Sequence, residues 1–190
     1  MKRSLIWLLS LACSTLYAAN QQDLDKLLQL QKTQTTHVDL SHTDLRRFAI
    51  TPGKIDLQQA NLSYSNLSGM DLSKMNLGGA DLSYSDLSHA KLNEVNLTDA
   101  NLSHANLTGA ELIRTDLSRA NLNSTNLIQA NLEQAIFTKA NLACANLNQA
   151  NLTKSNFTET IISGATFVNT ITVDISGYES VVDSKVNCDS

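Results

Sequence analysis

The chain has 190 residues, of which 42% are hydrophobic, with 14 Lys plus Arg, 18 Asp plus Glu and a net charge of −4 at pH 7. This mild acidity favours solubility and argues against binding to nucleic acid, which requires a basic surface. The three cysteines, Cys13, Cys144 and Cys188, do not have the spacing of metal ligands.

Residues 1–19 are predicted to be an export signal peptide. Lys2 and Arg3 precede an apolar run at residues 5–12, and small and polar residues follow as far as Ala19. The apolar run is too short to span a bilayer and has the length of a signal-peptide core. We therefore expect an exported protein, periplasmic or secreted, that is cleaved after Ala18 or Ala19. The mature chain then has 12 Lys plus Arg against 18 Asp plus Glu, a net charge of −6.

Cys13 supports a second interpretation of this segment. The sequence Leu11-Ala12-Cys13 partly matches a bacterial lipoprotein box, in which the cysteine carries a lipid anchor. Ser10 stands where that box usually has Leu. The cleaved signal is therefore the favoured interpretation, the lipid anchor at Cys13 is the alternative, and neither predicts a membrane span.

Residues 20–37 are predicted to form a short helical cap. Leu24, Leu27 and Leu28 fall on one helix face, and Asp23 and Asp25 lie in the first turn, where the helix dipole favours acids. Such a helix suits the open end of a stack of strands, because it covers backbone groups that have no partner. A helix that binds a partner protein is the alternative.

Residues 38–174 are predicted to form an all-β solenoid. Residues 55–169 consist of 23 consecutive five-residue units, whose third residue is Leu in 19 units and Phe or Ile in the rest. The residue two positions earlier is Ala in 13 units, and the residue one position earlier is Asn or Asp in 18. A period of five fits neither a helix nor a strand. An unbroken period indicates a solenoid in which each unit packs on its neighbours.

Four units make a square coil of twenty residues, with the large apolar residue at its centre and the small residue beside it. Residues twenty apart are then expected to stack on successive coils, about 4.8 Å apart. Three weaker units, centred on Leu40, Leu45 and Ile50, precede the main run. The step from Ile50 to Leu57 is seven residues and contains Pro52-Gly53, which predicts a loop of two inserted residues.

Runs such as Ala-Asn-Leu-Ser-His at residues 100–104 resemble the pentapeptide repeat family of proteins, here in the form of an exported bacterial member. The resemblance covers the main run and implies a right-handed quadrilateral β-helix. It implies no particular activity, because the family is defined by its architecture. Some members protect DNA gyrase by presenting an acidic rod that mimics DNA.

Charged residues twenty apart are expected to form ladders along the outside of the coils. Opposite charges adjoin in each ladder, which neutralises the faces locally and helps to fix the register of the coils. The three ladders are Lys74, Glu94, Arg114, Gln134 and Lys154; Asp71, Lys91, Glu111 and Asn131; and Asp99, Arg119, Lys139 and Glu159.

Tyr64, Tyr84 and His104 form another outward ladder, with serines around it. Stacked aromatic rings among hydroxyl groups suit a sugar or the edge of a peptide, so these three residues are the candidate partner-binding site. The alternative is that the rings stabilise adjacent strands and bind nothing.

Residues 175–190 are expected to form a tail that folds over the open end of the coil. Cys144 takes an outward corner position, and Cys188 lies near the C-terminus. Because exposed thiols rarely stay free in an oxidising compartment, a disulfide between Cys144 and Cys188 would strap the tail to the coil. A free surface thiol and a disulfide-linked homodimer are the alternatives.

The sequence favours a non-enzymatic module that binds no cofactor. Its four histidines have no acid and nucleophile at triad-like placement, and no glycine loop could cradle a phosphate. The favoured function is an exported structural or interaction module that presents its stacked faces to a protein or glycan. The alternative is a DNA-mimicking inhibitor or protector of a DNA-binding protein such as gyrase. The paired charges and the absence of loops within the 23 units argue against that alternative.

Overall fold

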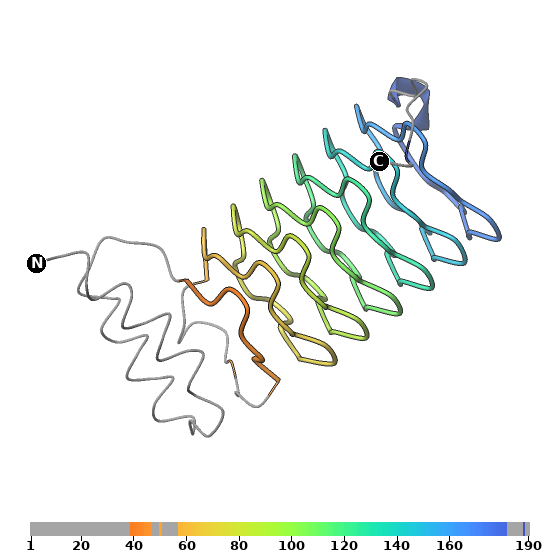
Figure 1. Ribbon diagram of the computed structural model, residues 1–190. Helices are drawn as coiled ribbons and strands as arrows, with labels where there is room; N and C mark the ends of the chain where they lie inside the picture. Colours follow the sequence, from red (N-terminus) through yellow and green to blue (C-terminus); the bar gives the residue numbers. More distant parts are fainter. Residues whose placement is uncertain (1–38, 47–49, 51–56, 182–187, 189–190) are drawn as a thin grey trace, which may run out of the picture.

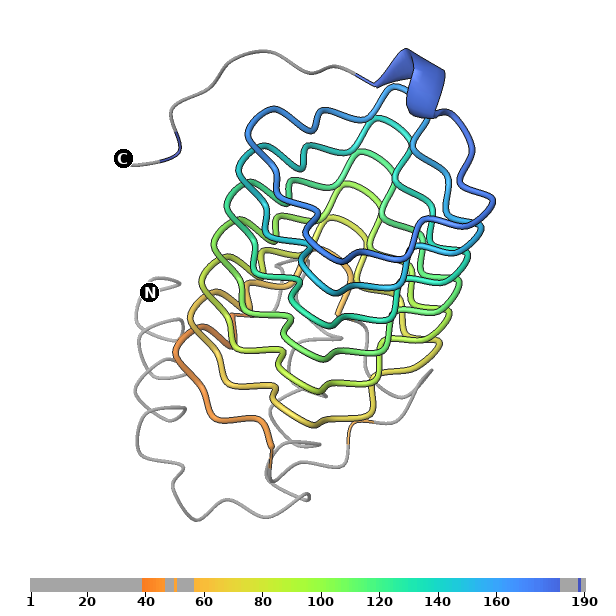
Figure 2. The same ribbon diagram turned by 90° about the vertical axis from the view of Figure 1, so that its right-hand side faces the viewer.

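The structure is a computed structural model that describes residues 39–46, 50, 57–181 and 188. The predicted signal peptide at residues 1–19 with Cys13, the helical cap at residues 20–37 and the loop at Pro52-Gly53 lie outside the described residues. The described chain winds into coils that are stacked along one axis to form a rod (Figures 1 and 2).

Parallel β-bridges join each coil to the next. Between Asn61 and Ser176 every bridge joins residues twenty apart, and four bridges occur in each turn of the chain, one for each side of the coil. The predicted all-β solenoid is therefore confirmed. In the first coil Asp39 pairs with Asn61 and Asp44 with Asn66, an offset of 22 that matches the two inserted residues predicted from the sequence.

The core is a column of large apolar side chains at the centre of the coils. We number each five-residue unit from −2 to +2, with the central Leu, Phe or Ile at position 0. Position 0 is almost completely buried from Leu57 to Phe157, and the small residue at position −2 lines the wall beside it. Phe137 and Phe157 pack on each other with their ring centroids 4.9 Å apart. Such dense packing leaves no space for larger side chains at position −2 in most units.

Hydroxyl groups also occupy position −2, and the backbone satisfies them. The buried Ser65 hydroxyl donates to the Leu62 carbonyl at 2.6 Å, within its own turn. The buried Thr115 hydroxyl donates to the Leu92 carbonyl of the preceding coil at 2.7 Å. No buried side-chain nitrogen or oxygen lacks a hydrogen-bond partner in the described part of the chain. Small polar residues can therefore replace Ala here without leaving an unpaired group.

The corners of the coil are tight turns. At the corner that contains Tyr64, the Ser65 N–H donates to the Leu62 carbonyl at 3.2 Å, and Tyr64 has a φ of 57°. The φ angle at position +2 is also positive in 20 other non-glycine residues, one of which is His42. It is positive as well at Gly69, Gly79, Gly109 and Gly164. A positive φ at the third turn residue is the property of a type II turn. This conformation directs the +2 side chain outward, away from the core.

Asparagines at position −1 form amide ladders between the coils. The Oδ1 atom of Asn101 accepts a hydrogen bond from the Ser103 N–H at 3.2 Å and from the Nδ2 group of Asn121 at 3.1 Å. Asn121 is bonded in the same way to Asn141, at 3.3 Å. Each asparagine thus fixes its own turn and also joins two coils, which explains its frequency at this position.

The coil continues to Ser176, two residues beyond the predicted boundary at 174, although Thr172 replaces the central Leu. The Ile171 N–H still donates to the Ala150 carbonyl at 2.9 Å, so backbone pairing holds the last turn in place. A 3-10 helix, η1 (Tyr178–Ser180), follows Gly177. Its Ser180 hydroxyl accepts a hydrogen bond from the Glu159 N–H at 2.9 Å. The start of the tail therefore caps one side of the coil and leaves Ile171 and Val173 exposed at the end.

Candidate functional site

The aromatic ladder is a continuous stack of four rings on one corner of the rod. Tyr64 and Tyr84 lie 4.8 Å apart between ring centroids, with only 1° between their planes. His104 stacks on Tyr84 at 4.6 Å, and His42 stacks on the other side of Tyr64 at 4.8 Å. The structure thus brings together the three residues predicted from the sequence and adds His42.

The ladder is straight because its four residues share one backbone conformation. Their φ angles lie between 57° and 59°. Hydrogen bonds from the Tyr64 N–H to the Ser83 carbonyl, at 2.9 Å, and from the Tyr84 N–H to the Ser103 carbonyl, at 3.0 Å, fix the spacing between coils. Each stacked pair of aromatic rings contributes about 0.5–1.5 kcal/mol beyond the area it buries.

Sequence reasoning missed His42 because counting twenty residues back from Tyr64 leads to Asp44. The two inserted residues shift this partner to position 42. The seven-residue step between Ile50 and Leu57 was the signal that could have identified it.

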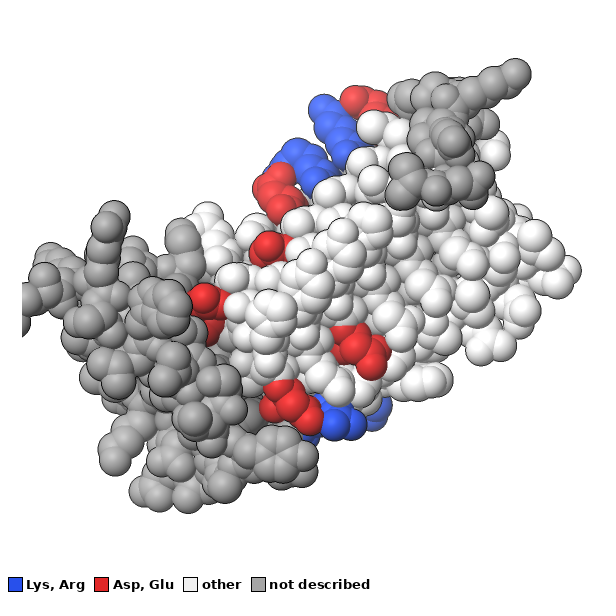
Figure 3. Space-filling model, in the orientation of Figure 1, with Lys and Arg blue, Asp and Glu red and all other residues white. Residues whose placement is uncertain are grey.

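The side of the rod that bears the ladder, which we call the aromatic face, has very little charge. It consists of residues 39–43, 61–65, 81–85, 101–105, 121–125, 141–145 and 161–165, and its only charged residues are Asp39 and Asp81. Figure 3 shows a row of charged side chains along the upper edge of the rod and, below it, a broad white area interrupted by a few separate acidic groups. The Tyr64 and Tyr84 side chains remain 51% and 48% exposed. Their ring faces cover one another, so a partner meets ring edges and phenol hydroxyls.

Serines beside the ladder are held in fixed orientations. The Ser63 hydroxyl donates to Asn61 Oδ1 at 2.7 Å, and the Ser103 hydroxyl donates to Asn101 Oδ1 at 2.8 Å. Because these hydroxyl protons are already used, the serine oxygens present lone pairs to the outside. The face therefore offers rigid hydrogen-bond acceptors next to aromatic edges.

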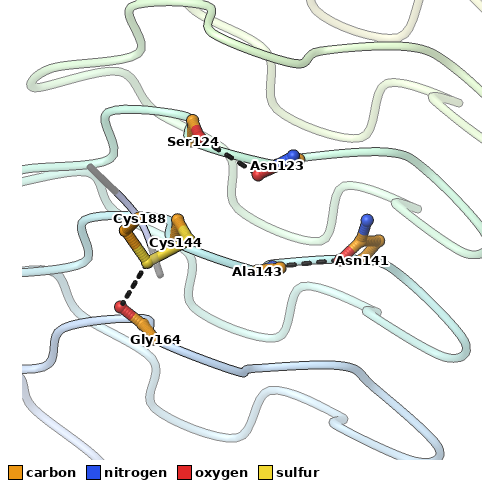
Figure 4. Close-up of a disulfide and its surroundings, with 7 residues drawn as sticks. All are labelled: Asn123, Ser124, Asn141, Ala143, Cys144, Gly164 and Cys188. Atoms are coloured by element: carbon orange, nitrogen blue, oxygen red, sulfur yellow. Dashed lines mark hydrogen bonds between the residues drawn. A yellow bond between two sulfur atoms is a disulfide. The ribbon is translucent and has the colours of Figure 1, made fainter. Parts of the chain in front are cut away.

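Beyond His104 the same corner carries Ser124, Cys144 and Gly164 (Figure 4). Cys144 is joined to Cys188 by a disulfide, with 5.5 Å between the two Cα atoms and 44 residues between them in the sequence. Gly164 makes room for this bond, since a Cβ atom built at Gly164 would overlap the Sγ atom of Cys188. The structure thus places the two predicted cysteines together, at the end of the corner that begins with the aromatic ladder.

Ion pairs occur in two of the three predicted charge ladders. Glu94 pairs with Arg114 and, at 4.0 Å, with Lys74. Arg119 pairs with Asp99 at 2.7 Å, and Lys139 pairs with Glu159 at 3.6 Å. All these side chains are well exposed, and exposed ion pairs contribute little to stability. They cancel charge along the edges of the rod.

Hydrogen bonds to arginine lower the pKa of two exposed carboxyl groups. The bond from Arg114, followed by the charge of Lys74, lowers the pKa of Glu94. The bond from Arg119 lowers the pKa of Asp99. In the remaining ladder, hydrogen bonds from Ser73 are the main reason that the pKa of Asp71 is lowered, with the charge of Lys91 as a minor cause.

The described residues provide no group of three or more His, Cys, Asp or Glu side chains that could hold a metal ion. Within the same ranges no helix is both long enough and apolar enough to cross a membrane.

The fold and its outer ladders define a four-sided β-solenoid whose functional groups lie on the surface of a closely packed rod. The sequence matches the family described as Pentapeptide repeats over residues 60–99, 80–119, 100–138, 115–153 and 135–171. The chain belongs to the pentapeptide repeat family. No protein with curated annotation matches it significantly.

Solved structures of the family share the fold. Two trypsin-treated variants of QnrB1, a plasmid-mediated fluoroquinolone resistance protein, align with TM-scores of 0.56 and 0.59 at 20% and 19% identity. The alignments cover 60% and 65% of this chain, and 58% and 67% of those chains. HetL, a protein involved in heterocyst differentiation regulation in Nostoc sp. strain PCC 7120, aligns at 23% identity with a TM-score of 0.38, over 83% of this chain and 94% of that chain. The two QnrB1 alignments show a common fold and nothing about function.

Proposed function

We propose that this protein is a non-enzymatic interaction module that binds a partner through its aromatic face. The observation that supports the proposal is the exposed stack of His42, Tyr64, Tyr84 and His104 on a surface with almost no charge. A stack needed only for stability could use any apolar side chain, whereas tyrosine keeps a polar group at the outer end of each ring.

The partner that fits this face is an uncharged part of a protein or a glycan. Serine oxygens accept hydrogen bonds beside the rings, and the tyrosine hydroxyls can both donate and accept them. Phosphate groups would find no Lys or Arg on the described units of this face. The surface is therefore suited to a ligand with hydroxyl or amide donors and apolar ring or C–H surfaces.

Capture of the partner tests the proposal. The immobilised mature protein should retain an envelope component, and the Tyr64→Ala/Tyr84→Ala variant should lose it. Gln129→Ala/Gln149→Ala is the matched control, because these stacked residues occupy position +2 on the next corner and are bonded to each other at 3.0 Å. Equal capture by the two double variants would contradict a role for the aromatic face.

Export is part of the proposal, and it places the protein in the periplasm or outside the cell. It is based on the signal-like pattern at residues 1–19. Intact mass of the natural product should give a chain that begins at Ala19 or Asn20. A chain that retains Met1 would contradict export, and an acylated Cys13 at the N-terminus would instead show a lipid anchor.

A second candidate function is the protection of a DNA-binding protein such as gyrase by mimicry of DNA. It is kept because QnrB1, a fluoroquinolone resistance protein, shares this fold. The ion pairs along the ladders argue against it, because they cancel the negative charge that a DNA mimic must present. A supercoiling assay with gyrase and a fluoroquinolone decides the matter: restored supercoiling would favour mimicry over the aromatic-face proposal.

A further inference from the structure

We propose that the corner at Ser124 is a binding slot for one aromatic side chain of a partner peptide, a proposal that rests on the proposed function of the aromatic face. The slot is the rung of the corner ladder that follows His104 and precedes Cys144 (Figure 4). A ring bound there would continue the stack that the chain itself begins.

The first wall of the slot is the imidazole of His104. One face of this ring is covered by Tyr84, at 4.6 Å between centroids and 6° between planes. Its other face points along the rod axis toward Ser124, whose side chain has no ring. The Ser124 hydroxyl donates sideways to Asn123 Oδ1 at 3.0 Å, which holds the short side chain against its own strand. The outer face of His104 is thus the exposed end of an aromatic stack.

The second wall is Cys144 on the next rung, and the Cys188 sulfur bonded to it lies on the far side, against Gly164. Cys144 occupies the same corner, one coil beyond Ser124, and Cys188 comes from the tail. The two walls are therefore separated by two coil spacings, about 9.6 Å along the axis. The ladder itself shows that one planar ring for each coil fills this spacing, because its rings lie 4.6–4.8 Å apart. Divalent sulfur next to an aromatic ring is a favourable contact.

Charge and shape select the class of ligand. The units of the aromatic face contain Asp39 and Asp81 but neither Lys nor Arg, so a nucleotide would bring its phosphates to a surface without cations. A sugar ring is thicker than the flat rings whose spacing the coils impose. Tyrosine and tryptophan side chains are flat and uncharged, and the peptide that carries them can bond to the serine oxygens beside the ladder.

NMR titration of the full mature chain with N-acetyl-L-tryptophanamide tests the slot. We expect saturable shifts of the His104 ring signals and of the Ser124 amide, with smaller changes at Tyr64. The Ser124→Tyr variant should abolish the saturable shifts, because it fills the slot with a ring of its own. This variant should fold, because a tyrosine already adopts the same backbone conformation in this ladder. The φ angle is 55° at Ser124 and 57° at Tyr84, which stacks on the opposite face of His104.

Two further variants test the Ser124 position and the second wall of the slot separately. Ser124→Ala leaves the slot open and should retain binding. Cys144→Ser/Cys188→Ser replaces the sulfur of the second wall with a hydroxyl oxygen, and it should weaken binding several-fold while the His104 signals still respond. Saturable shifts that persist in Ser124→Tyr, or an unshifted His104 in the wild-type protein, would overturn the proposal. If partner capture still depends on Tyr64 and Tyr84 in that case, the slot is wrong and the proposed function stands.

Discussion

Gly164 lies directly against the sulfur of Cys188. A Cβ atom built at Gly164 would overlap that sulfur and would lie 3.4 Å from the Sγ atom of Cys144. A side chain at residue 164 would therefore force the disulfide to move from this position. We predict that Gly164→Ala leaves Cys144 and Cys188 as free thiols, which are measured by alkylation without reductant and peptide mass mapping.

Gly69→Ala is the matched control for this variant. Gly69 has a φ of 68° against 71° for Gly164, so both substitutions carry the same backbone cost of about 1–2 kcal/mol. A Cβ atom at Gly69 would meet nothing within 4 Å. The control should keep the disulfide, and the wild-type protein should show no alkylated cysteine at either position. Alkylation of both wild-type cysteines would show that the strap does not form.

The second prediction concerns the core. Leu107 is completely buried, so Leu107→Lys would place a charge without a partner inside the coil. We expect the variant to lose cooperative unfolding and β-type circular dichroism. Gln129→Lys, at the outward corner of the corresponding unit one coil further along, should melt like the wild type. A normal melting curve for Leu107→Lys would mean that position 0 does not point inward.

Removal of one ring should weaken the aromatic ladder. Tyr84 stacks on both Tyr64 and His104, so Tyr84→Ala loses two aromatic contacts. We predict a decrease of about 1–3 kcal/mol in the free energy of unfolding, measured by denaturant titration. Lys154→Ala is the control, because Lys154 has a φ of 59° and Tyr84 a φ of 57°. Equal losses in the two variants would show that the rings add nothing beyond the backbone effect.

The ion pairs should make a contribution that depends on pH. Arg114, and then Lys74, lowers the pKa of Glu94, so the stabilisation is present above the ordinary pKa of the carboxyl group and is lost as the pH falls through its lowered value. Arg114→Gln should therefore lower the melting temperature slightly at about pH 7, and the difference from the wild type should be smaller at about pH 2, because a lower pH favours the protonated form of Glu94. Scanning calorimetry at both pH values measures this. If the melting temperatures of the variant and the wild type differ by the same amount at both pH values, the effect comes from packing of the aliphatic part of the Arg114 side chain.

The five-residue period predicts most of this fold because a single rule places nearly every side chain. Once Leu107 is assigned to the centre, the outward position of Tyr64, the pairing of Asp99 with Arg119 and the two-residue offset of the first coil all follow from counting. Counting also places Cys144 on the same corner as His104. These predictions depend on the backbone repeat alone, so no detail of side-chain packing is needed.

The backbone conformation of the corners was not predicted. Tyr64, Lys74 and Cys144 all adopt a positive φ, which is uncommon for residues that have a Cβ atom. The requirement comes from closing a coil within twenty residues, and the pattern of polar residues does not reveal it. Glycine carried the signal, since Gly69, Gly79, Gly109 and Gly164 share position +2. The proposed slot beside Ser124 was not predicted, although the sequence analysis placed both His104 and Cys144 at outward positions.

The pairing of each residue with the one twenty positions away makes the rod sensitive to the length of any insertion, rather than to its composition. Twenty extra residues between Gly109 and Ala110 would lengthen the rod by one coil and return Ser124 and Cys144 to the corner of Tyr84. Five extra residues would keep the leucines buried but rotate every downstream residue by a quarter turn. Gln129 and Gln149 would then leave the corner of His89, and Ser124 would occupy it instead. Relatives could therefore keep the same core and differ in which functions share one side of the rod.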